Sequence, residues 1–151
     1  MTYNAPYSGL PDPGYQSEFY DDIPTKRFIA WIIDVVIVVL ISIGISILTL
    51  GLGFFLFFGI MFIVGFLYRF ITLNGKSATL GMRLVAIEMV RSEGTPFDTS
   101  TALLHTVGYY ISMWFFLLQI VSIVLIIVTA RKQSATDHVL GTAALNQKAR
   151  Y

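Results

Sequence analysis

The sequence predicts an all-α membrane protein: an antiparallel transmembrane helix hairpin plus a third bent or re-entrant hydrophobic helix, with short amphipathic elements between. Of its 151 residues, 56% are hydrophobic and only 13% are charged, and the mean hydropathy is +0.73, well above the range of soluble domains. Two long apolar runs, at about 26–50 and 54–73, are separated only by Gly51-Leu52-Gly53. A third run covers about 99–130.

The first predicted helix, about 26–50, follows the basic pair Lys26 and Arg27 and contains one ionisable side chain, Asp34. The run is long enough to cross a hydrocarbon layer of about 30 Å. A carboxylate at the centre of such a helix is disfavoured by about 2.5 to 3.5 kcal/mol. Asp34 therefore requires either a partner or a function.

The second predicted helix, about 54–73, ends before Asn74-Gly75, where we expect a C-terminal cap. Because the linker is so short, the two helices should form an antiparallel hairpin. At about 1.5 Å rise per residue, this places Asp34 level with residue 70, one position from Arg69. We expect an ion pair between them; the alternative is that Arg69 extends to the interface while Asp34 pairs with another polar group.

The charged residues predict orientation. Residues 1–24 are acidic and rich in Tyr and Pro, which predicts a mostly disordered N-terminal tail. Basic residues flank the outer ends of both helices, whereas the Gly-Leu-Gly turn has no charge. The amino terminus and the 74–98 segment are therefore expected in the cytoplasm.

Two later segments leave alternatives open. Residues 83–91 fit either a strand or a helix lying at the interface. Residues 99–130 would make a straight helix of about 48 Å, too long for one upright span, so we expect a bend. The first part, capped by Asp98 or Thr99, should lie near the interface through about Met113, and the part from Trp114 should insert. Whether it crosses or re-enters is open, as is the side of the C-terminus, although nearby basic residues favour the cytoplasm.

Several function classes are disfavoured. The formal net charge is +1 and the N-terminal segment is acidic, which argues against nucleic acid as a partner. There is no cysteine, and His105 has no second ligand at metal-binding spacing. No residue pattern indicates a catalytic centre, so we expect neither an enzyme nor a cofactor or metal site.

Three blocks resemble the RDD family of small membrane proteins. Residues 27–34, RFIAWIID, resemble its R-x-x-A-x-x-I-D opening; 78–85, ATLGMRLV, resemble its A-T-x-G-x-R-x-V block; and 133–142 resemble its closing Q-x-x-x-D-x-x-x-G-T. The resemblance covers about residues 24–145 and implies a domain at 25–147, followed by a short C-terminal tail at 148–151. It departs at His105, where similar proteins often carry arginine, and at Ala143-Ala144, where they commonly have two valines.

By this resemblance the signature residues are Arg27, Asp34 and Asp137. Further candidates for the same polar network are Lys76, Gly81, Arg83, Gly141 and Thr142. Asp34 is either a proton or cation site whose charge state is set by Arg27, Arg69 or Asp137, or a structural group that arginines neutralise. Asp137 can also be explained as a helix cap.

The resemblance implies a protein of the bacterial cytoplasmic (inner) membrane that transports ions (cation or proton) or small solutes. Three short hydrophobic segments enclose too little space for a shielded pathway, so transport requires a homo-oligomer or another membrane protein in addition to the lipid bilayer. The alternative is a non-catalytic accessory or scaffold subunit of a membrane protein complex.

Overall fold

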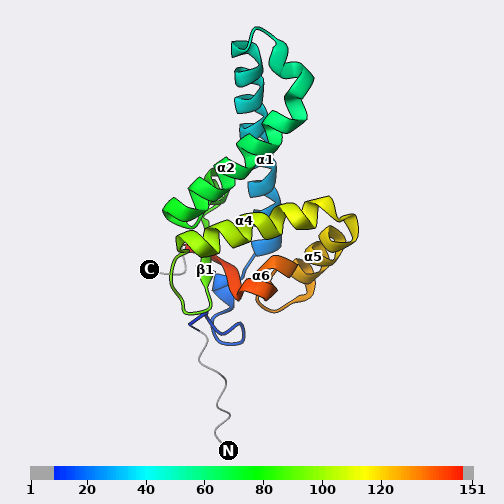
Figure 1. Ribbon diagram of the computed structural model, residues 1–151. Helices are drawn as coiled ribbons and strands as arrows, with labels where there is room; N and C mark the ends of the chain where they lie inside the picture. The colour runs from blue at the N-terminus through cyan, green and yellow to red at the C-terminus, as the bar shows by residue number, and fades with distance from the viewer. Residues whose placement is uncertain (1–8, 148–151) are drawn as a thin grey trace, which may run out of the picture.

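The computed structural model describes residues 9–147 as six α-helices, two short 3-10 helices and two strands. The elements are η1 (Ser17–Phe19), α1 (Ile23–Leu48), η2 (Leu52–Leu56), α2 (Phe57–Lys76), α3 (Leu80–Leu84), β1 (Ile87–Arg91), α4 (Thr99–Trp114), α5 (Phe116–Val128), α6 (Ala135–Leu140) and β2 (Thr142–Asn146). Figure 1 shows the α1–α2 hairpin projecting from a base formed by the other elements. The predicted fold class is confirmed, with a small sheet added.

The hairpin consists of the two helices that are long and apolar enough to cross a membrane. Gly51 makes the reversal with φ 87°, a conformation that glycine adopts without steric cost. The predicted end of the second helix was early, because Asn74 and Gly75 continue α2 and Ser77 is its C-cap. Ser77 holds that end by donating its backbone N–H to Leu73 and accepting a hydrogen bond from the Phe97 amide.

The third hydrophobic segment is bent, as predicted. The axes of α4 and α5 differ by 116° across a break at Phe115. Asp98 caps α4 by accepting a hydrogen bond from the Thr101 amide, which confirms one of the two predicted caps. The bend is bridged by Ser112, whose hydroxyl donates to the Gln119 side chain at 3.1 Å.

A two-stranded sheet determines where the bent segment returns. β1 and β2 are antiparallel, with Ile87 opposite Asn146 and Arg91 opposite Thr142. One strand precedes the α4–α5 pair and the other follows it, so their pairing brings both ends of the bent segment back to the same end of the molecule. This return agrees with the re-entrant alternative for the bent segment. Of the two alternatives for 83–91, the structure shows the strand, as β1 over Ile87–Arg91. Only residues 83 and 84 are helical, at the end of α3.

The segment before α1 does not form the disordered tail that the composition predicted. Leu10, Phe19 and Tyr20 are buried in one apolar cluster with residues of both strands. The Asn146 side-chain amide donates to two backbone carbonyls of this segment, and its oxygen accepts from Lys26 at 2.6 Å. The tail prediction is thus wrong for residues 9–22, while residues 1–8 and the predicted tail at 148–151 lie outside the described residues.

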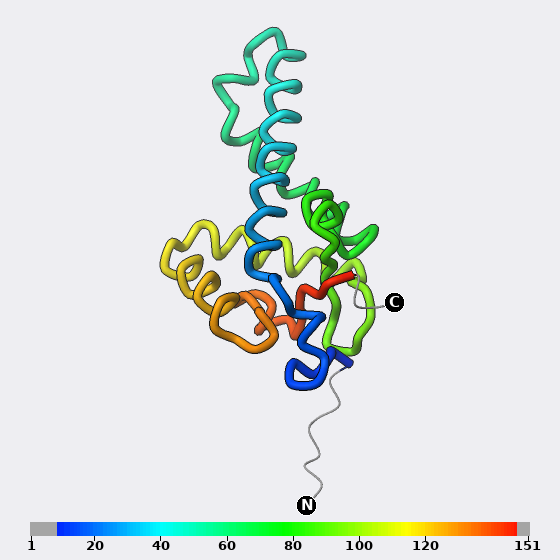
Figure 2. The backbone as a smooth tube through the Cα atoms, turned by 180° about the vertical axis from the view of Figure 1, so that it is seen from behind, coloured from blue at the N-terminus to red at the C-terminus, as the bar shows by residue number. Residues whose placement is uncertain are grey.

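The packed core lies at the base, where the hairpin meets the other elements. Figure 2 shows the start of α1, both strands and the bent pair gathered at this end. The main cluster of buried apolar side chains comprises Ile23, Ala30, Leu73, Ala78, Met82, Ile87, Met89, Phe97, Ala102 and Ala144. The far end of the hairpin instead exposes large apolar side chains such as Leu48, Leu50 and Phe55, as expected for a lipid-facing surface.

Candidate functional site

Asp34 lies on the inner face of α1 and is held by neutral hydrogen-bond donors. Its Oδ1 accepts from the Tyr68 hydroxyl at 2.6 Å and from the Gly81 amide at 2.9 Å, and its Oδ2 accepts from the Thr79 hydroxyl at 2.6 Å. Only 8% of Asp34 is exposed. A buried carboxylate is tolerated when it is hydrogen-bonded, and these donors satisfy that requirement without a formal counter-charge.

The local fold of α3 explains how the donors reach Asp34. Thr79 is the N-cap of α3 and accepts from the Met82 amide, so the Gly81 amide is one of the first-turn groups without an intrahelical acceptor. Gly81 also permits a close approach, because a Cβ there would collide with the Ala30 carbonyl and lie 2.7 Å from Asp34 Oδ1. Gly81 thus has a steric role in addition to its hydrogen bond.

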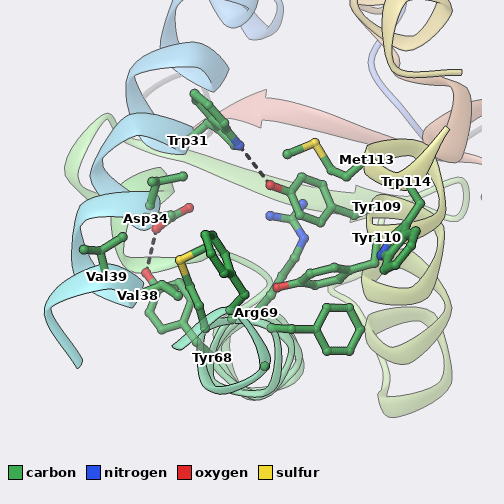
Figure 3. A pocket seen from close by; sticks show the side chains of 16 residues that line it. Trp31, Asp34, Val38, Val39, Tyr68, Arg69, Tyr109, Tyr110, Met113 and Trp114 are labelled. Carbon is green, nitrogen blue, oxygen red and sulfur yellow. Dashed lines mark hydrogen bonds between the residues drawn. The ribbon is translucent and has the colours of Figure 1, made fainter. Parts of the chain in front are cut away.

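Arg69 does not form the expected ion pair with Asp34. Its guanidinium instead lies 4.0 Å from the centre of the Tyr109 ring, a cation–π contact. The sequence predicted nearly the correct depth of Arg69 relative to Asp34, but it predicted the wrong face of α2. Successive residues on a helix point about 100° apart, so Tyr68 faces α1 and Arg69 faces α4. Figure 3 shows the two side chains diverging.

Arg69 also carries an unsatisfied donor. Its Nε is buried and has no hydrogen-bond partner within residues 9–147. Leaving a buried donor unpaired costs about 1–3 kcal/mol, and more for a charged group. Because Arg69 has no carboxylate within ion-pair distance in the described chain, its charge is available to an external group.

Asp137 is the centre of a separate polar cluster. Its Oδ2 accepts from Arg27 Nη1 at 2.8 Å and from the Ser134 amide at 2.9 Å, and its Oδ1 lies 2.9 Å from both His105 Nε2 and Thr142 Oγ1. Its side chain is completely buried. Burial alone would raise the pKa of Asp137, but the Arg27 charge and the hydrogen bonds from His105 and Ser134 hold it well below its ordinary value.

This cluster fastens the base of α1 to the end of the chain. Asp137 completes a capping box with Ser134 at the start of α6, which agrees with a capping role, and it also carries the ion pair to α1. His105 on α4 is a third member that the sequence did not identify. It and Asp137 are far apart in sequence, and no local spacing pattern indicates their contact.

The remaining candidates divide between the base and the surface. Thr142 belongs to the Asp137 cluster, and Gly141, at φ 65°, ends α6 as its C-cap. Arg83 Nε donates to the Ala78 carbonyl at 3.1 Å, and Lys76 is exposed at the end of α2. The signature residues therefore form two clusters, one around Asp34 and one joining Arg27 to Asp137.

Two cavities adjoin these clusters. The first cavity, about 740 Å³, lies between α1, α2 and α4, and the second, about 720 Å³, lies between α1, α4, α5 and α6. Both volumes fall within the range of small-molecule sites. The residues that line both cavities are Trp31, Asp34, Arg69, Tyr109 and Met113.

A hydrogen bond crosses the boundary between the cavities. The indole N–H of Trp31 donates to the Tyr109 hydroxyl at 2.9 Å, as Figure 3 shows. The carboxylate of Asp34 and the guanidinium of Arg69 thus share walls of largely apolar cavities without contacting each other. Within residues 9–147 no group of three or more His, Cys, Asp or Glu side chains is arranged to hold a metal ion. The arrangement is suited to binding an ion or a small polar group.

The model of the RDD family matches residues 23–141, which is most of the chain. The match includes all three signature residues and both cavities' charged side chains. Comparison with curated proteins and with solved structures gave no match.

Proposed function

The chain belongs to the RDD family, and we propose that it is an inner-membrane protein that transports a cation, a proton or a small solute as a homo-oligomer. The observation that carries the proposal is the position of Asp34. It lines both cavities, and within residues 9–147 its hydrogen-bond partners are Tyr68, Thr79 and Gly81, which are neutral.

An acid held in this way suits reversible ion binding. An Asp paired with arginine has to break an ion pair before it takes up a proton or a cation. Asp34 has no such pair in the described chain, so uptake breaks no ion pair and involves only its hydrogen bonds with Tyr68, Thr79 and Gly81. Ionisable residues inside a membrane commonly mark ion or substrate pathways.

The fold supports an oligomer and an orientation. Two spans and a bent helix pair enclose too little space for a complete pathway, so copies of the chain would have to supply the remaining walls. Basic residues cluster at the base, where Lys26, Arg27, Lys76, Arg83, Arg131 and Lys132 lie near the polar ends of their helices. By the positive-inside rule, this distribution favours a cytoplasmic position for the base.

The proposal is tested by flux in proteoliposomes. A pH-sensitive dye inside the vesicles reports proton movement when a gradient of sodium, potassium or a candidate solute is imposed. We expect flux from the natural chain and a loss of about tenfold or more in Asp34→Asn. Glu93→Gln removes the same charge from an exposed turn and should keep full flux.

A second candidate is an accessory subunit of a membrane protein complex. The bend between α4 and α5 exposes three consecutive aromatic side chains, Trp114, Phe115 and Phe116, at 78%, 62% and 76%. Aromatic residues are enriched in the centres of protein interfaces. Absence of flux in both the natural chain and Asp34→Asn, with co-purification of a stoichiometric partner, would favour this role and contradict transport.

A further inference from the structure

We propose that the second cavity binds the headgroup of an anionic phospholipid, with Arg69 contacting the phosphate and the acyl chains lying along α5. This inference concerns a lipid site and does not depend on transport. It follows from the charges, the polar groups and the apolar wall of that cavity.

One cation that lines the cavity has no anionic partner within residues 9–147. The ionisable side chains that line it are Arg27, Asp34, Arg69 and His105. Arg27 is paired with Asp137, and the Asp34 oxygens accept three hydrogen bonds from α2 and α3. Arg69 makes no side-chain hydrogen bond within residues 9–147, and its Nε is buried. A guanidinium in this state is a natural ligand for a phosphate group.

Tyr109 holds Arg69 in a defined position. The guanidinium lies over the Tyr109 ring at 4.0 Å, and the Tyr109 hydroxyl is fixed by Trp31. Figure 3 shows Arg69 extending from α2 to this ring across the space between α1 and α4. Because the side chain is already ordered, little rotamer entropy remains to be lost when an anion binds.

The opposite side of the cavity is apolar and open to the exterior. Ile123, Ile126 and Ile127 line it from α5 and Phe28 from α1, and Phe28 and Ile127 are 61% and 57% exposed. An occupant must therefore present an apolar part on this side. A free inorganic anion has none, whereas a phospholipid has both parts.

The position along the helices fits a headgroup. Arg27 is about one turn from the start of α1, and Arg69 is about two turns from the end of α2, so both lie near the base. Basic pockets between membrane helices at this level bind anionic lipid headgroups. Polar side chains of the bent pair, including Ser112 and Gln119, line the same space and could contact the remainder of the headgroup.

The test counts bound lipid by native mass spectrometry of the full chain. The protein is purified in detergent and titrated with phosphatidylglycerol, which is anionic, or phosphatidylcholine, which is zwitterionic. We expect saturable binding of phosphatidylglycerol with an affinity about tenfold higher than that of phosphatidylcholine. Inorganic phosphate at the same concentration serves as the headgroup-only probe and should not compete.

The matched variants are Arg69→Gln and Lys76→Gln. Each removes one positive charge from α2, but Lys76 lies outside both cavities and is exposed. Arg69→Gln should lose the preference for phosphatidylglycerol, whereas Lys76→Gln should keep it. Equal binding of the two lipids by the natural chain, an unchanged preference in Arg69→Gln, or displacement of the lipid by phosphate would overturn the proposal.

A second pair keeps the test decisive if Arg69→Gln fails to fold. Ile126→Trp fills the apolar side of the cavity, and Val124→Trp places the same bulk on α5 at a position that does not line it. We expect weaker phosphatidylglycerol binding for Ile126→Trp only. Equal binding by these two variants would contradict the assignment of the acyl chains to this cavity.

Discussion

Asp137→Asn tests how much the buried ion pair contributes to stability. The substitution keeps the shape of the side chain but removes its charge and converts one oxygen into a donor. The natural carboxylate accepts from Arg27, His105, Ser134 and Thr142. In the variant, the donors that bond to one of the two carboxylate oxygens in the natural chain would face an NH₂ group instead. Arg27 would also remain at the base without its counter-ion.

The expected loss is large. Removing one partner of a buried ion pair costs about 3–5 kcal/mol, because the other charge is left uncompensated. The Arg27 side chain is 12% exposed and Asp137 is fully buried, so water can compensate only part of this loss. We therefore expect the free energy of unfolding to fall by about 3 kcal/mol or more.

The assay is equilibrium unfolding in mixed detergent micelles, followed by circular dichroism. Glu93→Gln is the control, because its side chain is 59% exposed and should change the unfolding free energy by less than about 0.5 kcal/mol. Combining Asp137→Asn with Arg27→Gln removes both charges, and the double variant should lose less than the sum of the single variants by about 1–3 kcal/mol. A loss below about 1 kcal/mol for Asp137→Asn, or strict additivity with Arg27→Gln, would refute the reasoning.

The packing at Gly81, the titration of Asp137 and the sheet give three further predictions. Gly81→Ala should lower thermal stability and flux together, because the new methyl group meets the Ala30 carbonyl; unchanged melting would contradict this contact. The pKa of Asp137 is depressed in the folded chain, so its stabilisation is complete above the ordinary value of about 3.8 and is lost as pH falls through the folded value. The stability difference between the natural chain and Asp137→Asn should accordingly be constant above about pH 5 and shrink below about pH 4; a difference that grows on acidification would be inconsistent with it. Because the chain has no cysteine, single cysteines at Leu50 and Gln147 can be labelled with an impermeant maleimide, and a re-entrant α4–α5 pair predicts that they label from opposite sides; labelling from the same side would indicate a full span.

The elements that rest on local patterns were predictable from the sequence. The apolar runs and the Gly-Leu-Gly turn predicted the hairpin. The excessive length of 99–130 predicted a bend, which the structure has at Phe115. The depth of Asp34 followed from the rise per residue. Each of these depends on spacing along one segment or across one short turn.

The elements that rest on contacts between distant segments were not predictable. The choice of Tyr68 over Arg69 as the partner of Asp34 depends on the rotation of α2 about its axis, and a depth estimate carries no such information. The packing of residues 9–22 depends on a sheet whose second strand lies near residue 145. His105 joined the Asp137 cluster for the same reason, since α4 and α6 meet only in the folded chain.

The groups that stabilise Asp34 also differ in chemical type from those expected. The sequence analysis predicted that Asp34 pairs with a basic residue of the hairpin, Arg69. Its carboxylate is instead hydrogen-bonded to hydroxyl and amide donors. Within residues 9–147, neither Arg69 nor Asp34 forms an ion pair, so Arg69 can bind an external anion. The transport proposal and the phospholipid proposal both depend on this separation of Asp34 from Arg69.

Infrared difference spectroscopy of the reconstituted protein tests most directly whether Asp34 exchanges a proton or a cation. A pH step or the addition of the transported cation should change the carboxyl and carboxylate bands in the natural chain and in Glu93→Gln. The part of this change that comes from Asp34 should be absent in Asp34→Asn. The same band change in Asp34→Asn, or no change in the natural chain, would contradict the role proposed for this residue.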